Sequence, residues 1–262
     1  MLSDLVAGAV ADASERRAIR PLKEVEADAL SRPAALDAMA ALAPADRVKI
    51  IAEVKRASPS RGPLADIADP ASLAVSYQTG GASAISVLTE GRRFLGSLAD
   101  LEAVRAAVDI PVLRKDFIAE PYQVFEARAS GADLVLLIVA ALEQPVLAEL
   151  HQLIAQLGMT ALVETHSADE VERALDVGAS VVGVNARNLS TFELDRELFG
   201  SLADRIPSGV IRIAESAVTE PADVARYRAA GADVVLVGEA LVTGGDPVAV
   251  LQSFLTANTV SA

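Results

Sequence analysis

Eight short apolar segments recur along the chain, and their spacing restricts its fold more than any other feature. Each segment is apolar throughout rather than alternating with polar residues. Continuous apolar runs of about five to seven residues are typical of parallel strands that are covered on both faces. The predicted strands are residues 49–54, 83–88, 110–114, 133–139, 159–163, 180–184, 210–214 and 233–237.

Helical segments with recognisable ends lie between these runs. Ser97 and Ser167 are placed to cap the start of a helix, and prolines at 70, 121 and 221 suit a first helical turn. Gly-Ala pairs at 81, 131, 178 and 231 precede every second strand, about 50 residues apart. Eight strand-and-helix units predict a (β/α)8 TIM barrel. A doubly wound open sheet is the alternative, although such sheets usually have fewer strands.

The length of 262 residues accommodates one such barrel, so residues 1–262 are expected to form a single domain. Residues 1–47 precede the first strand and are predicted to be helices packed on the barrel, with breaks at Pro21 and Pro33. Hydrophobic residues make up 52% of the chain, which is enough for a large core. A mobile tail is the alternative for residues 1–47.

The charge and hydropathy pattern excludes several kinds of partner. The net charge of −13 argues against sequence-independent binding of nucleic acid. The longest uncharged apolar run, 134–142, is far shorter than the roughly 20 residues that a membrane-spanning helix needs. The N-terminus has no basic segment typical of a signal peptide. We therefore expect a cytoplasmic protein that binds neither a membrane nor nucleic acid.

Charged residues gather where the predicted strands end, which is where TIM barrels build their active sites. The ends carry Glu53 and Lys55, Lys115, Glu164, Asn185 and Arg187, and Glu215. Opposite charges at close quarters shift one another's pKa values and prepare a general acid and a general base. Only four residues are lysine, against nineteen arginines, and lysine can release its proton when its pKa is lowered. A lowered pKa is therefore expected for a catalytic lysine.

Phosphate binding is the second predicted property of the same end of the barrel. Ser216 follows the seventh strand and Gly238 the eighth, where barrels often hold phosphate on backbone N–H groups. His166 lies near the site, but no second histidine or cysteine completes a cluster of metal ligands with it, so no metal site is predicted. No Gly-x-Gly-x-x-Gly fingerprint follows a strand, and no cofactor is expected. Basic residues in the loops, among them Arg56, Arg61 and Arg92, are expected to make the mouth locally positive despite the net charge.

The segments at these strand ends resemble the indole-3-glycerol phosphate synthase family. The resemblance begins with residues 51–60, IAEVKRASPS, and continues through 113–117, 162–164, 184–189 and 214–216, in order and over essentially the whole chain. It implies an enzyme that closes the indole ring of 1-(2-carboxyphenylamino)-1-deoxyribulose 5-phosphate with loss of CO₂ and water, in tryptophan biosynthesis. It also implies a monomer, associating at most weakly with other enzymes of the pathway.

The resemblance further implies roles for individual residues. Lys115 would be the general acid and Glu164 the general base, with Lys55 pairing the substrate carboxylate. Glu53 would assist dehydration, and Asn185 and Glu215 would orient the ring and hydroxyl groups. The substrate-binding residues would be Ser58, Phe94, Phe117, Arg187, Ser216 and Gly238.

One position departs from the family pattern, because Ala217 stands where many members have glycine after the Glu-Ser pair. If the N–H of this residue approaches the phosphate closely, the methyl group requires a small adjustment of the local geometry. Phosphoribosylanthranilate isomerase, another phosphate-binding barrel, is the nearest rival, but it uses a Cys or Asp pair and this chain has no cysteine. A catalytically inactive barrel that serves as a binding subunit is the second rival.

Overall fold

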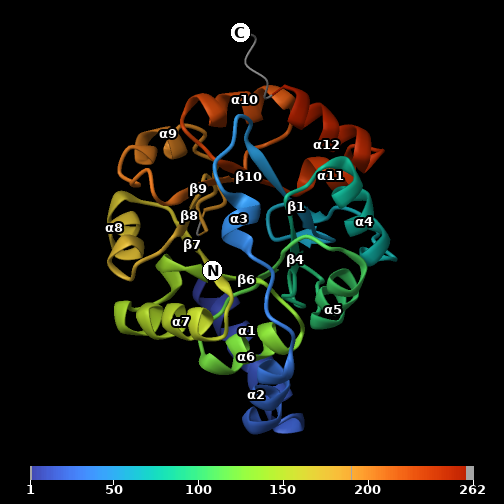
Figure 1. Ribbon diagram of the computed structural model, residues 1–262, viewed down its shortest axis with the longest axis vertical. Helices are drawn as coiled ribbons and strands as arrows, with labels where there is room; N and C mark the ends of the chain where they lie inside the picture. Colours follow the sequence, from blue (N-terminus) through green and yellow to red (C-terminus); the bar gives the residue numbers. More distant parts are fainter. Residues whose placement is uncertain (1, 190, 258–262) are drawn as a thin grey trace.

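A computed structural model describes residues 2–189 and 191–257, and its strands close into a barrel (Figure 1). The barrel strands are β1 (Lys49–Val54), β4 (Ala84–Leu88), β5 (Val112–Lys115), β6 (Leu134–Ile138), β7 (Thr160–Thr165), β8 (Val181–Asn185), β9 (Ile211–Glu215) and β10 (Val234–Val237). Each pairs in parallel with its neighbours in the order β1-β10-β9-β8-β7-β6-β5-β4, closed on itself. This confirms the predicted TIM barrel and excludes the open sheet.

Helices form a ring outside the strands, as Figure 1 shows. They are α4 (Pro70–Gly80), α5 (Leu98–Ala107), α6 (Pro121–Ala129), α7 (Gln144–Gln156), α8 (Ala168–Asp176), α9 (Leu198–Ala203), α10 (Pro221–Ala229), α11 (Glu239–Thr243) and α12 (Pro247–Thr256), with the short 3-10 helix η1 (Val139–Ala141) after β6. The side chains of Ser97 and Ser167 cap α5 and α8 as predicted. The glycines at 81, 131, 178 and 231 all have positive φ, as predicted for residues that follow a helix.

The N-terminal segment forms α1 (Leu2–Ile19), α2 (Leu22–Ser31) and α3 (Ala38–Leu42), interrupted at the two predicted prolines. Leu42 of α3 packs on interior residues of the barrel, and α3 lies over the centre of the barrel in Figure 1. Leu5 and Ala9 of α1 belong to the same apolar cluster as Phe117 at the end of β5. These helices therefore pack on the barrel, and α1 lies beside the loops that follow the strands.

A small hairpin interrupts the loop between β1 and α4. Its two strands, β2 (Ala57–Ser58) and β3 (Gly62–Pro63), pair antiparallel, with Ser58 opposite Gly62. No helix among residues 2–189 and 191–257 is both long and apolar enough to cross a membrane.

Candidate active site

Strand alternation places the charged residues inside the barrel mouth. One apolar layer of the interior includes Ile51, Leu113, Leu162 and Ile213. Two residues further along the same four strands stand Glu53, Lys115, Glu164 and Glu215. Because residues i and i+2 of a strand share a face, each of these polar side chains continues an interior apolar column to its carboxyl end. The predicted convergence of lysine and glutamates is therefore confirmed.

Lys115 lies at the centre of three carboxylates. Its Nζ donates a 2.8 Å hydrogen bond to Glu215 Oε2. The same Nζ lies 3.6 Å from Glu164 Oε2 and 3.9 Å from Glu53 Oε2. All three glutamate side chains are at most 3% exposed. A buried ammonium among buried carboxylates is a site in which protons can move over short distances.

Lys55 forms the second ion pair of the mouth. Its Nζ lies 2.7 Å from Glu53 Oε1, so the two oxygens of Glu53 face the two lysines. Gly238, which follows β10, lies against the same pair, because a methyl group on Gly238 would overlap Glu53 Oε1 and approach Lys55 Nζ to 2.9 Å. The absence of a side chain at Gly238 therefore leaves room for the Glu53–Lys55 ion pair.

Asn185 and Ser216 are hydrogen-bonded to each other across β8 and β9. Ser216 Oγ donates to Asn185 Oδ1 at 2.8 Å, and the backbone N–H of Arg187 donates to the same oxygen at 3.0 Å. Ser216 and Ala217 both have positive φ, 68° and 57°. The left-handed conformation costs a residue with a Cβ roughly 1–2 kcal/mol, which explains why glycine suits position 217. Ala217, the departure from the family pattern, therefore adopts a conformation that is strained for alanine.

The expected lowering of the lysine pKa is wrong for Lys115. Burial alone would lower the pKa of its ammonium, but the charges of Glu215, Glu164 and Glu53 outweigh burial and raise the pKa well above the usual value for lysine. Lys115 is therefore firmly protonated, and it can donate its proton only as negative charge develops on a nearby acceptor.

The two carboxylates closest to Lys115 differ in proton affinity. Burial raises the pKa of Glu215 to about 7, with the Glu164 charge adding to the rise and Lys115 opposing it. Burial would also raise the pKa of Glu164, but Lys115, His166 and Asn185 lower it to about 2. Glu164 is therefore ionised at neutral pH, and Glu215 has the higher proton affinity of the pair.

Comparison with known proteins decides the family. The sequence profile described as indole-3-glycerol phosphate synthase matches residues 2–254. The chain is 74% identical over 254 residues to the "Indole-3-glycerol phosphate synthase" of Leifsonia xyli subsp. xyli, covering 97% of each protein. It is 60% identical over 259 residues to the protein of that name from Mycolicibacterium gilvum, covering 99% of this chain and 95% of that one.

The chain belongs to the indole-3-glycerol phosphate synthase family. Solved structures of other proteins share only its fold. A thiamine phosphate pyrophosphorylase from Pyrococcus furiosus superposes with a TM-score of 0.60 at 14% identity, covering 81% of this chain and 95% of that one. An N-acetylmannosamine-6-phosphate 2-epimerase from Clostridium perfringens gives a TM-score of 0.62 at 15% identity, covering 82% of this chain and 94% of that one.

The other substrate-binding residues implied by the family resemblance lie on different elements around the barrel mouth. Phe94 and Phe117 lie together, with ring centroids 6.2 Å apart, and join the apolar cluster at the α1 side of the mouth. The guanidinium of Arg187 donates to the carbonyl of Phe192 at 3.1 Å, within its own loop. Ser58 lies in the β2–β3 hairpin, where its hydroxyl is 3.5 Å from that of Ser60.

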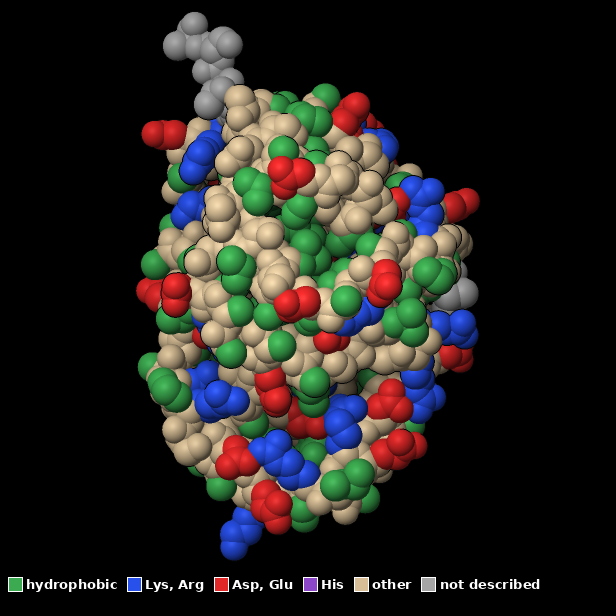
Figure 2. Space-filling model, turned by 90° about the vertical axis from the view of Figure 1, so that its right-hand side faces the viewer, with side chains coloured by type: hydrophobic (Ala, Val, Ile, Leu, Met, Phe, Trp, Pro, Cys, Tyr) green, Lys and Arg blue, Asp and Glu red, His purple; other side chains and the backbone are tan. Residues whose placement is uncertain are grey.

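The locally positive mouth expected from the loop arginines is only partly present. Arg56 is paired with Asp100, Arg61 with Glu239 and Arg92 with Asp12. Figure 2 shows the same intermixing on one face of the molecule, where basic and acidic side chains alternate rather than gather by sign. The loop sequences alone could not show this, because the acidic partners lie on other elements.

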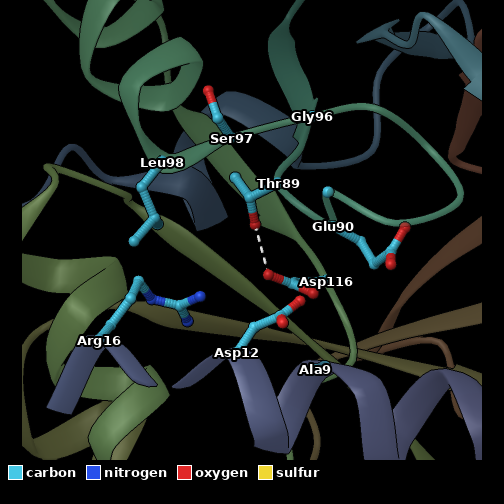
Figure 3. A pocket seen from close by; sticks show the side chains of 10 residues that line it. Ala9, Asp12, Arg16, Thr89, Glu90, Gly96, Ser97, Leu98 and Asp116 are labelled. Atoms are coloured by element: carbon cyan, nitrogen blue, oxygen red, sulfur yellow. Dashed lines mark hydrogen bonds between the residues drawn. The ribbon is translucent and has the colours of Figure 1, made fainter. Parts of the chain in front are cut away.

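A cavity of about 210 Å³ lies between α1 and the loop after β4, apart from the lysine cluster. Figure 3 shows Asp12 and Arg16 of α1 facing Thr89 and Asp116 across it. Thr89 Oγ1 donates to Asp116 Oδ2 at 2.6 Å, and the wholly buried Arg114 also bonds Asp116. Lys115 lies on the opposite face of β5, so this network stabilises the strand that carries it without lining the site.

Gly183 is a residue of the site that the sequence reasoning missed. It lies on the interior face of β8, and a methyl group there would overlap Glu215 Oε1. The absence of a side chain therefore gives the Glu215 carboxylate its place beside Lys115. A glycine in the interior of a predicted strand is the signal that could have revealed this close approach.

We expect Gly183→Ala to cost about 1–3 kcal/mol of unfolding free energy, the usual cost of overpacking. Displacing Glu215 from Lys115 is also expected to lower kcat by about 10- to 100-fold. Urea unfolding and steady-state assays measure both effects. Gly209→Ala is the matched control, because a methyl group on Gly209 meets nothing within 4 Å and φ there is not positive. Equal kcat in the two variants would show that the position of Glu215 does not matter.

Proposed function

We propose that this chain converts 1-(2-carboxyphenylamino)-1-deoxyribulose 5-phosphate to indole-3-glycerol phosphate, CO₂ and water. The observation that carries the proposal is the convergence of Lys115 and Lys55 on three buried glutamates at the mouth of the barrel. Ring closure needs a proton donor, and the later dehydration needs a donor and a base, so this cluster supplies the required groups. The reaction is a decarboxylating step of tryptophan biosynthesis, and the family assignment supports it.

Lys115 is the general acid of ring closure. The aromatic carbon that bears the carboxylate attacks the ketone carbon, the C=O π electrons move to oxygen, and Nζ of Lys115 gives that oxygen a proton. The high proton affinity of Lys115 delays transfer until the oxygen carries developing negative charge. Loss of CO₂ then returns the electrons of the C–C bond to the ring. Lys55, on the other side of Glu53, pairs with the substrate carboxylate before it leaves.

Glu164 is the general base of the final step. The hydroxyl leaves as water with a proton from a lysine, for which Lys55 is placed beside Glu53. Glu164 then removes the carbon-bound proton, and the electrons of the C–H bond complete the indole. The 3.6 Å between Glu164 Oε2 and Lys115 Nζ gives this proton a short path back to the acid. Asn185 and Glu215 orient the ring and hydroxyl groups.

The remaining binding groups are assigned by position. Phe94 and Phe117 provide an apolar wall for the aromatic ring, and Ser58 lies in the hairpin within the loop between β1 and α4. Arg187 lies at the end of β8, within the field of Glu239 and Arg61. A substrate with a phosphate and a carboxylate fits a mouth that carries two lysines.

The phosphate is expected between Ser216 and Gly238, close to Lys55. These residues follow the last two strands of the barrel, a frequent phosphate site in this fold. A crystal structure with inorganic sulfate or phosphate tests the assignment. Density bridging the N–H groups after β9 and β10 supports it, whereas an anion bound only elsewhere in the mouth contradicts it.

The proposal extends to the domain organisation, the oligomeric state and location, and the partners of the protein. The assignment of residues 1–262 to one domain is supported by the packing of α1 and α3 against the barrel, within the part of the chain that the structure describes. The protein acts as a monomer in the cytoplasm, at most weakly associated with other enzymes of the pathway. Neither nucleic acid nor a membrane is a partner, consistent with the net charge of −13.

Indole fluorescence tests the proposed reaction directly. The chain has no tryptophan, so new indole emission during incubation with the ring-open substrate reports product alone. Emission that rises in step with CO₂ release supports the proposal. An isomerase would consume phosphoribosylanthranilate without forming indole, and an inactive barrel would bind the substrate without either signal.

A further inference from the structure

His166 and Glu170 lie next to the proposed base, and the mechanism above does not use them. His166 follows β7 directly, and its side chain is 13% exposed. The ring lies between two carboxylates, with Nε2 3.4 Å from Glu164 Oε1 and Nδ1 3.2 Å from Glu170 Oε2. Nε2 is buried and forms no hydrogen bond in this geometry, so its contact with Glu164 is an ion pair. The imidazole therefore bridges the site and the first turn of α8.

The start of α8 fixes the position of the imidazole. Ser167 caps the helix and accepts the backbone N–H of Glu170 at 3.2 Å. Glu170 Oε2 accepts the backbone N–H of His166 at 2.8 Å and also faces the ring Nδ1 of the same residue. One carboxylate thus holds both the backbone and the ring of His166, which leaves Nε2 directed at Glu164.

The two oxygens of Glu164 face different cations as a result. Oε1 faces His166 Nε2, and Oε2 faces Lys115 Nζ at 3.6 Å. Glu164 itself is only 2% exposed, so these neighbours rather than water determine its orientation.

We propose that His166, held by Glu170, is a positioning residue that fixes Oε1 of Glu164 so that Oε2 is the oxygen that accepts the substrate proton. This inference rests on the proposed role of Glu164 as the base. In the step concerned, the proton passes from the substrate carbon to Oε2, the C–H electrons stay in the ring, and His166 keeps both of its own protons. His166 therefore acts through Glu164 and does not touch the reacting carbon.

The charge state of His166 agrees with this role. Burial would lower its pKa, but contacts with Glu164 and Glu170 raise the pKa of His166 to about 10. Glu193 and Asp195 line, together with His166, a cavity of about 580 Å³. Both ring nitrogens therefore carry protons at neutral pH and face the two carboxylates.

Titration of His166 by nuclear magnetic resonance tests the charge state without substrate. The chain has two histidines, so His151→Gln assigns the signals. We expect His166 to stay doubly protonated up to about pH 9 in the wild type. In Glu170→Gln, which keeps the shape of the side chain but removes its charge, the pKa of His166 should fall toward the ordinary value of about 6.5. Titration of wild-type His166 near pH 6.5 would overturn the proposal.

The pH dependence of kcat tests the positioning role. In Glu170→Gln, neutral His166 should hold Glu164 less well, so kcat is expected to fall about tenfold as pH rises from 6 to 9, relative to the wild type, with KM little changed. Glu172→Gln is the matched control, because Glu172 lies on the same helix, is 66% exposed and pairs with Arg205. His166→Gln should have a lower kcat than the wild type at every pH. Its kcat should not show the fall between pH 6 and 9 that is expected for Glu170→Gln, because no histidine is left to titrate.

The positioning role would be overturned if kcat of Glu170→Gln depended on pH in the same way as kcat of the wild type, at equal melting temperature. The same holds if His166→Gln keeps wild-type kcat. Failure of the proposed function looks different, because the wild type and Glu172→Gln would then form no indole at any pH, while the histidine titration would be unaffected.

Discussion

Lys115→Arg is expected to lower kcat by 10²- to 10⁴-fold, the usual cost of removing a general acid, while the protein stays folded. Arginine keeps the positive charge that the three glutamates require, so the ion pairs around position 115 can still form. It cannot release a proton at any accessible pH. The substitution therefore separates the electrostatic contribution of Lys115 from proton donation. Initial rates from indole fluorescence and melting temperatures measure the two effects.

Lys23→Arg is the control for this experiment, because Lys23 is an exposed residue of α2. Its kcat and melting temperature should match those of the wild type. Near-wild-type kcat in Lys115→Arg, with an unchanged pH dependence, would remove Lys115 from the role of acid. A large fall in melting temperature would instead show that the longer guanidinium does not fit the buried cluster. In that case kcat of Lys115→Met would be measured as well, at a temperature where both variants are folded.

Glu164→Gln is expected to lower kcat by roughly 10²-fold or more, with KM changed little, because the lost proton transfer is felt in the transition state. Glutamine keeps the length and the hydrogen-bonding reach of the side chain but cannot accept the proton. If Glu164 only pairs with Lys115, the variant should lose thermal stability and keep most of its kcat. Measuring melting temperature and kcat on this one variant distinguishes the two roles.

Glu215→Gln provides the sharpest comparison with Glu164→Gln. The pKa of Glu215 is near 7, the value that suits a base at neutral pH, whereas Glu164 is held near 2. Proton affinity alone would therefore favour Glu215 as the base, and the family resemblance favours Glu164. If Glu164 is the base, kcat in its variant should fall further than in Glu215→Gln. The reverse order would transfer the role to Glu215.

The fold could be predicted from the sequence because its signals are local. Each strand is a continuous apolar run, and each Gly-Ala pair places a positive φ at the end of a helix. The strand boundaries differ from the predicted ones by no more than two residues, as at β5, which begins at Val112 and ends at Lys115. The polar residues of the mouth followed from the same pattern, since they stand at the carboxyl ends of predicted strands or directly after them.

The electrostatics could not be predicted in this way, because they depend on the register between strands. Glu53, Glu164 and Glu215 surround Lys115 only because β1, β5, β7 and β9 end at one level of the barrel. The sequence showed two lysines and three glutamates near one mouth, but not that all three carboxylates lie within 3.9 Å of Lys115 Nζ. The direction of its pKa shift was therefore predicted wrongly.

Long-range partners were hidden for the same reason. Arg61 pairs with Glu239 and Arg92 with Asp12, which lie on distant parts of the chain. The bridge from Glu164 through His166 to Glu170 spans only seven residues, yet it depends on the turn between β7 and α8 rather than on a residue pattern. The sequence shows only that His166 has no second metal ligand nearby, whereas the structure shows that its ring lies between two carboxylates.

A crystal structure of the wild-type protein with an unreactive substrate analogue tests the central claim most directly. In this analogue the ketone is reduced to an alcohol, so the ring cannot close and the complex can be observed. We predict that the hydroxyl oxygen that replaces the ketone oxygen lies within about 2.6–3.2 Å of Lys115 Nζ, with the carboxylate at Lys55 and the phosphate between Ser216 and Gly238. An oxygen directed away from Lys115, with no proton donor of this cluster within reach, would contradict the assignment of Lys115 as the acid that closes the ring.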